Sequence, residues 1–226
     1  MNYKKKISKL SSFLYNLSIK FIKKDLKYYQ NFENKKNGSR KETDQRWRLI
    51  KKIIIKEKIK NILDLGSAEG FFIKKFSDMG IFSLGIEGDE RRFLVSNHTL
   101  NKNKYKNYAV VHNKIALKFV EKIPEFQSIL YLSVHHHILA ALGKKNANLI
   151  LKEIFKKSKR SMFFETAMHD EKSKEWNNNY KINLKDISEN NIKLFFKKLG
   201  ARKVEIIGYT KAYNKGYKRP LFYIKK

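Results

Sequence analysis

Short apolar runs alternate with longer amphipathic stretches from residue 61 to the end of the chain, and this alternation constrains the fold more than any other feature. We expect strands at residues 61–65, 82–87, 108–111, 128–134, 161–165, 204–209 and 220–224. Helices are expected between them at residues 69–79, 90–100, 114–121, 145–157 and 187–199. This order predicts an α/β fold with a mostly parallel sheet that helices cover on both faces.

The last two expected strands differ from the others in how they are connected. Only residues 210–219 join them, and this segment is too short for a crossover helix. We therefore expect the two strands to form an antiparallel hairpin at one side of a seven-stranded sheet.

The first 60 residues are strongly basic, with 19 Lys and Arg against 5 Asp and Glu. An apolar stripe recurs there at spacings of three and four residues, which predicts a basic amphipathic helix. Its members are Ile7, Leu10, Leu14, Leu17 and Phe21. We expect the stripe to pack on the main domain. Two alternatives stay open: peripheral contact of residues 5–24 with a membrane surface, and a lid over a substrate.

A polar segment at residues 31–40 follows this helix and is predicted to be a linker. A second helix is expected from Thr43, a residue suited to the N-cap, to Lys58. The chain is therefore expected to consist of a basic helical extension with its linker at residues 1–44 and a main domain at residues 45–226.

The composition excludes several classes of protein. The chain has no cysteine, so disulfides, thiolate metal sites, thiol nucleophiles and iron–sulfur clusters are ruled out. No apolar run reaches the roughly 18 to 20 residues that a membrane-spanning helix needs. The Lys-rich start resembles the beginning of a signal peptide, but Lys9, Asn16 and Lys20 interrupt the stretch after it. We therefore expect a cytoplasmic location.

The net charge of +30 suggests a polyanionic partner such as RNA. However, the basic residues are 43 Lys and only 8 Arg, and Asn occurs 20 times. This skew is typical of AT-rich coding, and a protein that reads nucleic acid would favour Arg for bidentate contacts. The charge therefore supports an RNA partner only in part.

The most informative segment is residues 62–72, Ile-Leu-Asp-Leu-Gly-Ser-Ala-Glu-Gly-Phe-Phe. An expected strand ends near Asp64, and Gly66 and Gly70 then allow a tight turn and the close approach of a ligand to the backbone. Seventeen residues beyond Gly70, the next strand ends in Glu87, where a carboxylate can accept hydrogen bonds from a ribose diol. These segments predict a nucleoside-binding crevice across the carboxyl ends of two adjacent parallel strands.

Two kinds of cofactor compete for this crevice. A nicotinamide dinucleotide fingerprint needs glycine at its first, third and sixth positions. Here these positions are Gly66, Ala68 and Phe71. Asp64 and Glu69 would also repel a pyrophosphate. The same acids suit a cationic ligand such as S-adenosylmethionine, whose ammonium group Asp64 could bind directly or through water.

Residues 64–70, Asp-Leu-Gly-Ser-Ala-Glu-Gly, followed by Gly85-Ile-Glu87, resemble motif I and the acidic second-strand end of the Rossmann-like, class I S-adenosylmethionine-dependent methyltransferases. The resemblance covers residues 45–226 and includes the expected terminal hairpin. It implies S-adenosylmethionine as the cofactor and a set of residues that would hold it: Asp64, Gly66, Ser67, Ala68, Gly70, Glu87 and Asn113. Ala68 departs from the commoner glycine, and Asn113 stands near the position where the family often has an acid beside the adenine.

Three adjacent histidines follow the expected fourth strand, whose carboxyl end faces the methyl group and the substrate in this family. His135 or His136 is therefore a candidate base, since a neutral imidazole with a pKa near about 6.5 can take a proton from an attacking hydroxyl. Three alternatives stay open: a structural role at the start of the next helix, a reaction that needs no base, and a metal site. The metal site is disfavoured because no carboxylate lies at ligand spacing.

Two further residues are candidate substrate contacts. Glu165 ends the fifth expected strand, where a substrate could reach it, and pairing with a lysine is the alternative. Tyr213 lies among lysines in the loop of the hairpin and could stack on a polar substrate. A solvated loop is the alternative for Tyr213.

The sequence therefore predicts an S-adenosylmethionine-dependent methyltransferase that acts on an oxygen or nitrogen of a small molecule or sugar. One rival is an RNA methyltransferase, which the charge favours and the shortage of Arg disfavours. Another is a non-catalytic or membrane-docked module that keeps the cofactor fold. A dehydrogenase is disfavoured by Ala68 and Phe71. The sequence does not predict the oligomeric state.

Overall fold

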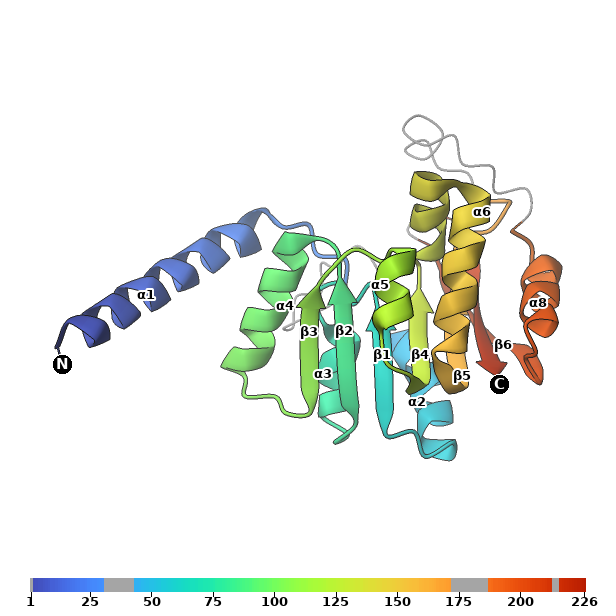
Figure 1. Ribbon diagram of the computed structural model, residues 1–226, viewed down its shortest axis with the longest axis horizontal. Coiled ribbons are helices and arrows are strands. Elements are labelled where there is room, and N and C mark those ends of the chain that lie inside the picture. The colour runs from blue at the N-terminus through green and yellow to red at the C-terminus, as the bar shows by residue number, and fades with distance from the viewer. Residues whose placement is uncertain (1, 31–42, 172–186, 213–215) are drawn as a thin grey trace.

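The computed structural model describes residues 2–30, 43–171, 187–212 and 216–226, with side chains from residue 11 onward. Seven strands form one sheet in the order β3-β2-β1-β4-β5-β7-β6 (Figure 1). They are β1 (Asn61–Leu65), β2 (Phe82–Glu87), β3 (Tyr108–His112), β4 (Phe126–Leu132), β5 (Ser158–Glu165), β6 (Lys203–Lys211) and β7 (Lys218–Lys225). Strands β1 to β5 are parallel, and β7 runs antiparallel to both β5 and β6.

Helices cover both faces of this sheet. The described helices of the chain are α1 (Asn2–Asp25), α2 (Thr43–Lys56), α3 (Phe71–Ser77), α4 (Glu90–Lys102), α5 (Leu117–Lys122), α6 (His135–Lys156) and α8 (Glu189–Lys198), of which α1 does not lie on the sheet. In Figure 1, α5 and α6 lie in front of the strands, and α2 and α3 lie behind them. The seven-stranded Rossmann-like α/β fold with its antiparallel hairpin, predicted from the sequence, is confirmed.

The central strand β4 contributes side chains to two hydrophobic clusters, one on each face of the sheet. Ile129 and Tyr131 belong to the cluster under α5, α6 and α8. Leu130 and Leu132 belong to the cluster under α2 and α3. Side chains alternate between the two faces of a strand, and all four are buried because helices cover both faces.

The largest difference from the predicted elements lies between β4 and α6. The strand expected to end at residue 134 ends at Leu132, because Ser133 has a left-handed backbone with φ 59°. Helix α6 then begins at His135, ten residues before the expected start, and it contains a non-helical residue at Gly143 (φ 76°, ψ 165°). His135 and His136 therefore lie in the first turn of a helix.

The described part of the apolar stripe of α1 does not pack on the main domain. Leu14, Leu17 and Phe21 have exposed fractions of 54%, 38% and 61%. Our expectation is therefore wrong for these three residues, while the side chains of Ile7 and Leu10 lie outside the described part of the chain. No helix in the ranges that the structure describes has the length and apolarity of a bilayer-crossing segment.

A different face of α1 contacts the domain. Ile19 is buried, and the ring of Tyr15 lies 5.8 Å from the ring of His98 on α4. Just after the helix, Leu26 packs in a small cluster with Val95 of α4. Beyond this contact with α4, the helix extends away from the sheet (Figure 1).

Replacing Phe76 tests the core that joins α2 to α3. The Phe76 side chain is fully buried, and its ring lies 5.3 Å from that of Trp47. We expect Phe76→Ala to lower the free energy of unfolding by about 3–5 kcal/mol in urea denaturation, because it removes apolar contacts and leaves a cavity. Ile55→Ala on α2, where Ile55 is 55% exposed, should change it by less than about 0.5 kcal/mol. Equal losses in the two variants would contradict this assignment of the core.

Candidate functional site

The turn between β1 and α3 is built from left-handed backbone. Gly66, Ala68 and Gly70 have φ values of 78°, 49° and 87°. The backbone N–H groups of Gly66 and Ser67 both donate to the carbonyl oxygen of Ile86 on β2, at 2.8 and 3.1 Å. Ala68 carries a Cβ in this conformation, at a cost of about 1 kcal/mol or more. The turn is therefore held in one shape by its pairing with β2.

Two glycines allow close approaches in this region. A Cβ on Gly66 would collide with the Val134 side chain, which follows β4. A Cβ on Gly85 of β2 would lie 2.8 Å from the hydroxyl oxygen of Ser67. The Ser67 hydroxyl is thus buried against β2, whereas the Gly66 backbone meets the end of β4. Gly66 therefore brings the turn of β1 directly against the segment that leads to the histidines.

Asp64 lies near the end of β1, between Gly85 of β2 and Leu130 of β4. It is only 2% exposed, and its Oδ2 atom has no hydrogen-bond partner among the described residues. Burial raises the pKa of Asp64, the nearby charge of Glu87 raises it as well, and Arg46 lowers it, so that the pKa is about 7. A buried carboxylate with an unpartnered oxygen suits a cationic ligand, which would supply both a hydrogen bond and a compensating charge.

Glu87 ends β2 beside the same turn. Its Oε2 accepts from the backbone N–H of Ala68 at 2.7 Å, and its Oε1 accepts from that of Asp89 at 2.8 Å. A carboxylate oxygen has two acceptor positions, so each oxygen keeps one for a ligand hydroxyl. Asn113 follows β3, is exposed, and donates its backbone N–H to the Glu87 carbonyl oxygen at 2.9 Å. The structure thus places Asp64, Glu87 and Asn113 at the carboxyl edge of three neighbouring strands.

Glu69 has a role that the sequence did not indicate. Its fully buried carboxylate accepts from the backbone N–H groups of Tyr29 and Gln30, at 2.8 and 3.0 Å, and it pairs with Arg92. The side-chain oxygen of Gln30 in turn accepts from the N–H of Phe71 at 3.0 Å. Burial raises the pKa of Glu69, and Arg92 opposes that shift. The repulsion of a pyrophosphate that we expected from Glu69 is therefore offset by Arg92.

His135 has a buried ring nitrogen that finds no partner among the described residues. It is 5% exposed, its Nδ1 has no partner among the described residues, and its ring meets those of Tyr131 and Phe164 at 6.1 and 5.7 Å. Burial lowers the pKa of His135 to about 4. The imidazole is therefore neutral at physiological pH and is a weak base.

His136 is held by hydrogen bonds to the end of β5. Its Nδ1 accepts from the backbone N–H of Ala167 at 3.2 Å and lies 3.3 Å from the hydroxyl oxygen of Thr166. Because Nδ1 accepts, the proton of the neutral ring is on Nε2. In this tautomer His136 is a donor at Nε2.

Glu165 lies inside a buried polar network. It has no exposed surface, and its two oxygens accept from the hydroxyls of Ser133 and Thr210 at 2.6 and 2.8 Å. A guanidinium nitrogen of Arg46 lies 3.7 Å from the same carboxylate. The network thus connects α2, the residue after β4, β5 and β6. A direct contact of Glu165 with substrate stays a prediction, and Tyr213 lies outside the described residues.

A second buried ion pair adjoins this network. Arg219 of β7 donates to both oxygens of Glu171, at 2.7 and 2.6 Å, and to the Ser133 hydroxyl at 3.2 Å. Ser133 therefore joins two charge pairs, each with one Arg and one Glu. Truncating a single member would leave an unpaired buried charge.

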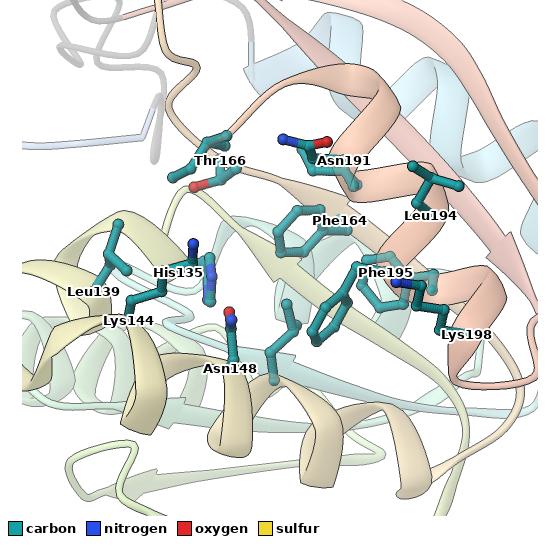
Figure 2. A pocket seen from close by; sticks show the side chains of 14 residues that line it. His135, Leu139, Lys144, Asn148, Phe164, Thr166, Asn191, Leu194, Phe195 and Lys198 are labelled. Atoms are coloured by element: carbon teal, nitrogen blue, oxygen red, sulfur yellow. The ribbon is translucent and has the colours of Figure 1, made fainter. Parts of the chain in front are cut away.

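A cavity of about 310 Å³ lies between α6, α8 and the end of β5 (Figure 2). Apolar side chains form most of its wall, among them Leu151, Phe164, Ile192 and Phe196. Polar groups are few: His135 and Thr166 lie near the sheet, and Lys144, Asn148, Asn191 and Lys198 lie on the helices. The cavity suits a group that is largely apolar and carries a polar substituent. Over the described ranges, no cluster of three or more His, Asp or Glu side chains could hold a metal ion.

Solved structures resemble this fold closely. WbdD, described as a bifunctional kinase–methyltransferase, matches with a TM-score of 0.75 and 19% identity over 91% of this chain and 45% of its own. Magnesium protoporphyrin IX methyltransferase (ChlM) from Synechocystis PCC 6803, with bound SAM, matches with a TM-score of 0.60 and 11% identity, covering 80% of this chain and 78% of its own. EvdMO1 matches with a TM-score of 0.62 and 13% identity, covering 93% and 47%.

These likenesses show that the fold is that of the class I S-adenosylmethionine-dependent methyltransferases. The chain spans less than half of the length of the WbdD chain it matches. No protein-family model matches the chain, and no curated protein matches its sequence.

The raised pKa of Asp64 predicts a pH-dependent effect of Asp64→Asn. An unfolded Asp has a pKa near about 3.9, whereas the folded value is about 7. Between these pH values the folded chain keeps a proton that the unfolded chain has lost, so this group makes the free energy of unfolding fall as pH rises. The free energy of unfolding of Asp64→Asn minus that of wild type, measured by urea denaturation, should therefore be larger at pH 8 than at pH 4.5.

The matched control is Ser83→Ala, which changes a buried polar residue of β2 that does not titrate. The free energy of unfolding of Ser83→Ala should differ from that of wild type by the same amount at both pH values. A difference for Asp64→Asn that is also constant with pH would contradict the assignment of Asp64 as a strained buried acid.

Proposed function

We propose that the chain is an S-adenosylmethionine-dependent methyltransferase. The observation that carries the proposal is the Asp64 carboxylate, buried beneath a left-handed turn with one oxygen unpartnered and with Glu87 at the end of the adjacent strand. When bound, S-adenosylmethionine supplies an electrophilic methyl group on a positively charged sulfur. The fold shared with methyltransferases supports the same conclusion.

Each residue at the edge of the sheet would bind a different part of the cofactor. Asp64 would hold the ammonium group, and Glu87 would accept hydrogen bonds from the ribose hydroxyls through its free acceptor positions. Asn113 would pair with the edge of the adenine. The backbone of the turn would approach the cofactor closely, and its members are Gly66, Ser67, Ala68 and Gly70.

The histidines would act on the acceptor. The contact between Gly66 and Val134 brings His135 to the side of the cofactor turn. With its low pKa, His135 is better suited to orient an acceptor hydroxyl or amine than to hold its proton. His136, whose ring follows that of His135 in the first turn of α6, stays the second candidate for this role.

The cavity between α6 and α8 supports a small-molecule acceptor that is methylated on oxygen or nitrogen. Its wall is mostly apolar, and Lys144 and Lys198 at the helices would suit an anionic substituent. A sugar would need an apolar aglycone to use this surface. RNA is the second candidate acceptor, because the chain has a net charge of +30.

The organisation of the chain is proposed as a basic extension at residues 1–44 and a cofactor-binding domain at residues 45–226. The end of the extension is part of the site, since Tyr29 and Gln30 bind Glu69. A cytoplasmic location stays a prediction.

Calorimetry with S-adenosylmethionine tests the binding site. Asp64→Asn and Glu87→Gln should each weaken binding by about 1.5–3 kcal/mol, because each removes a charged hydrogen-bond partner of the ligand. Glu125→Gln removes a carboxylate at the opposite edge of the sheet, where the Glu125 side chain is 56% exposed, and should leave the affinity unchanged. Wild-type affinity in both site variants would show that the site is misplaced.

A methyl-transfer assay with labelled S-adenosylmethionine and a panel of hydroxylated and amino acceptors tests the role of the histidines. His135→Ala and His136→Ala should lower the rate of transfer about 100-fold or more while cofactor affinity stays the same. His169→Ala, outside the first turn of α6, should keep the rate. Unchanged rates in both variants would dismiss the histidine proposal, and label found only in RNA would replace the small-molecule acceptor by the RNA alternative.

A further inference from the structure

Helix α1 presents an apolar face that no other described part of the chain covers. Phe13, Leu14, Leu17 and Phe21 have exposed fractions of 62%, 54%, 38% and 61%. At about 100° per residue, these four side chains fall within an arc of about 100° on one side of the helix. Ile19, which is buried, lies on the other side. The exposed face therefore points away from the domain.

The charges of α1 are almost all positive. Its sequence contains seven lysines, and its single acid is Asp25, the last residue. Lys20 lies just outside the arc that contains Phe13 and Phe21, Lys24 lies within it, and both are exposed. The helix thus combines an apolar face with lysines on it and at its edge, and it extends away from the sheet (Figure 1).

We propose that α1 docks this face on a membrane surface rich in anionic lipids. The phenylalanines and leucines would enter the boundary between headgroups and acyl chains, and the lysines would contact lipid phosphates. Apolar burial and charge attraction act together in such binding, and this helix offers both on adjacent surfaces.

Two other occupants of the face fit the charges less well. A second copy of α1 would bring many lysines together with hardly any acid to pair with them, so the like charges would repel. RNA would contact the lysines but leave the phenylalanines and leucines in water. An anionic membrane satisfies both kinds of side chain.

The docking proposal is independent of methyl transfer, but it has a consequence for the site. Residues 26–30 follow α1 directly, and Tyr29 and Gln30 are fixed to Glu69 in the cofactor turn. If α1 is bound to a membrane, only a few residues of chain separate the docked helix from the residues that are fixed to the cofactor turn. The turn would therefore lie near the bilayer surface.

Vesicle sedimentation with the full chain tests the proposal without any cofactor. The probes are vesicles of phosphatidylcholine alone and vesicles of phosphatidylcholine and phosphatidylglycerol at about seven to three. The double variant Leu17→Ser, Phe21→Ser should partition at least about tenfold less onto the anionic vesicles. The double variant Lys20→Gln, Lys24→Gln should also bind the anionic vesicles more weakly than wild type. Wild type should bind vesicles of phosphatidylcholine alone more weakly than anionic vesicles. Ile55→Ser is the matched control, because Ile55 is 55% exposed on α2, and it should bind as wild type does.

Circular dichroism and thermal unfolding of each variant establish that the fold is kept. Equal partition of wild type and the Leu17, Phe21 variant would overturn the proposal, as would no binding of wild type to anionic vesicles. A dimer in light scattering that Phe21→Ser dissociates, without vesicle binding, would assign the face to a second copy. If the chain binds RNA but not vesicles, and Phe21→Ser leaves the RNA affinity unchanged, the membrane proposal is overturned in favour of RNA.

Discussion

The buried carboxylate of Asp64 is the constraint on which the proposed chemistry depends. It lies on β1 between β2 and β4, almost without solvent contact, where its charged form is unfavourable and its pKa rises to about 7. Arg46 compensates this charge only partly. A ligand that brings a positive charge to this point is therefore favoured, whereas a diphosphate would add to the unfavourable charge.

The edge of the sheet around Asp64 is held by contacts between distant segments. Glu69 fastens the end of the N-terminal extension to the cofactor turn, and the network centred on Glu165 and Ser133 fixes the segment after β4. Buried ion pairs such as Arg219–Glu171 contribute little net stability, because desolvation offsets their attraction. Their contribution here is geometric: Arg219 and Glu165 both bind the Ser133 hydroxyl, at the point where β4 has ended and α6 is about to begin.

Local patterns predicted most of the fold, and with it the edge of the sheet at which the candidate cofactor residues lie. Residues 61–65 and 82–87 are strands with the predicted ends, because a buried apolar run followed by a glycine turn has few other conformations. The start of α6 was missed because Ser133 ends the strand through its left-handed backbone. A serine in the sequence does not by itself indicate this conformation. The pairing of Glu69 with Gln30 joins residues 39 apart, and no spacing rule predicts it. The face of α1 that contacts α4 could not be chosen from periodicity, since Ile19 and Ile22 form a second apolar side of the same helix.

A crystal structure grown in the presence of both S-adenosylmethionine and a nicotinamide dinucleotide tests the central claim most directly. We predict electron density for the sulfonium nucleoside over β1 and β2, with its ammonium nitrogen within hydrogen-bond distance of Asp64 and its ribose hydroxyls on Glu87. A dinucleotide in that crevice, or an Asp64 carboxylate that makes no contact with the bound nucleoside, would contradict the account.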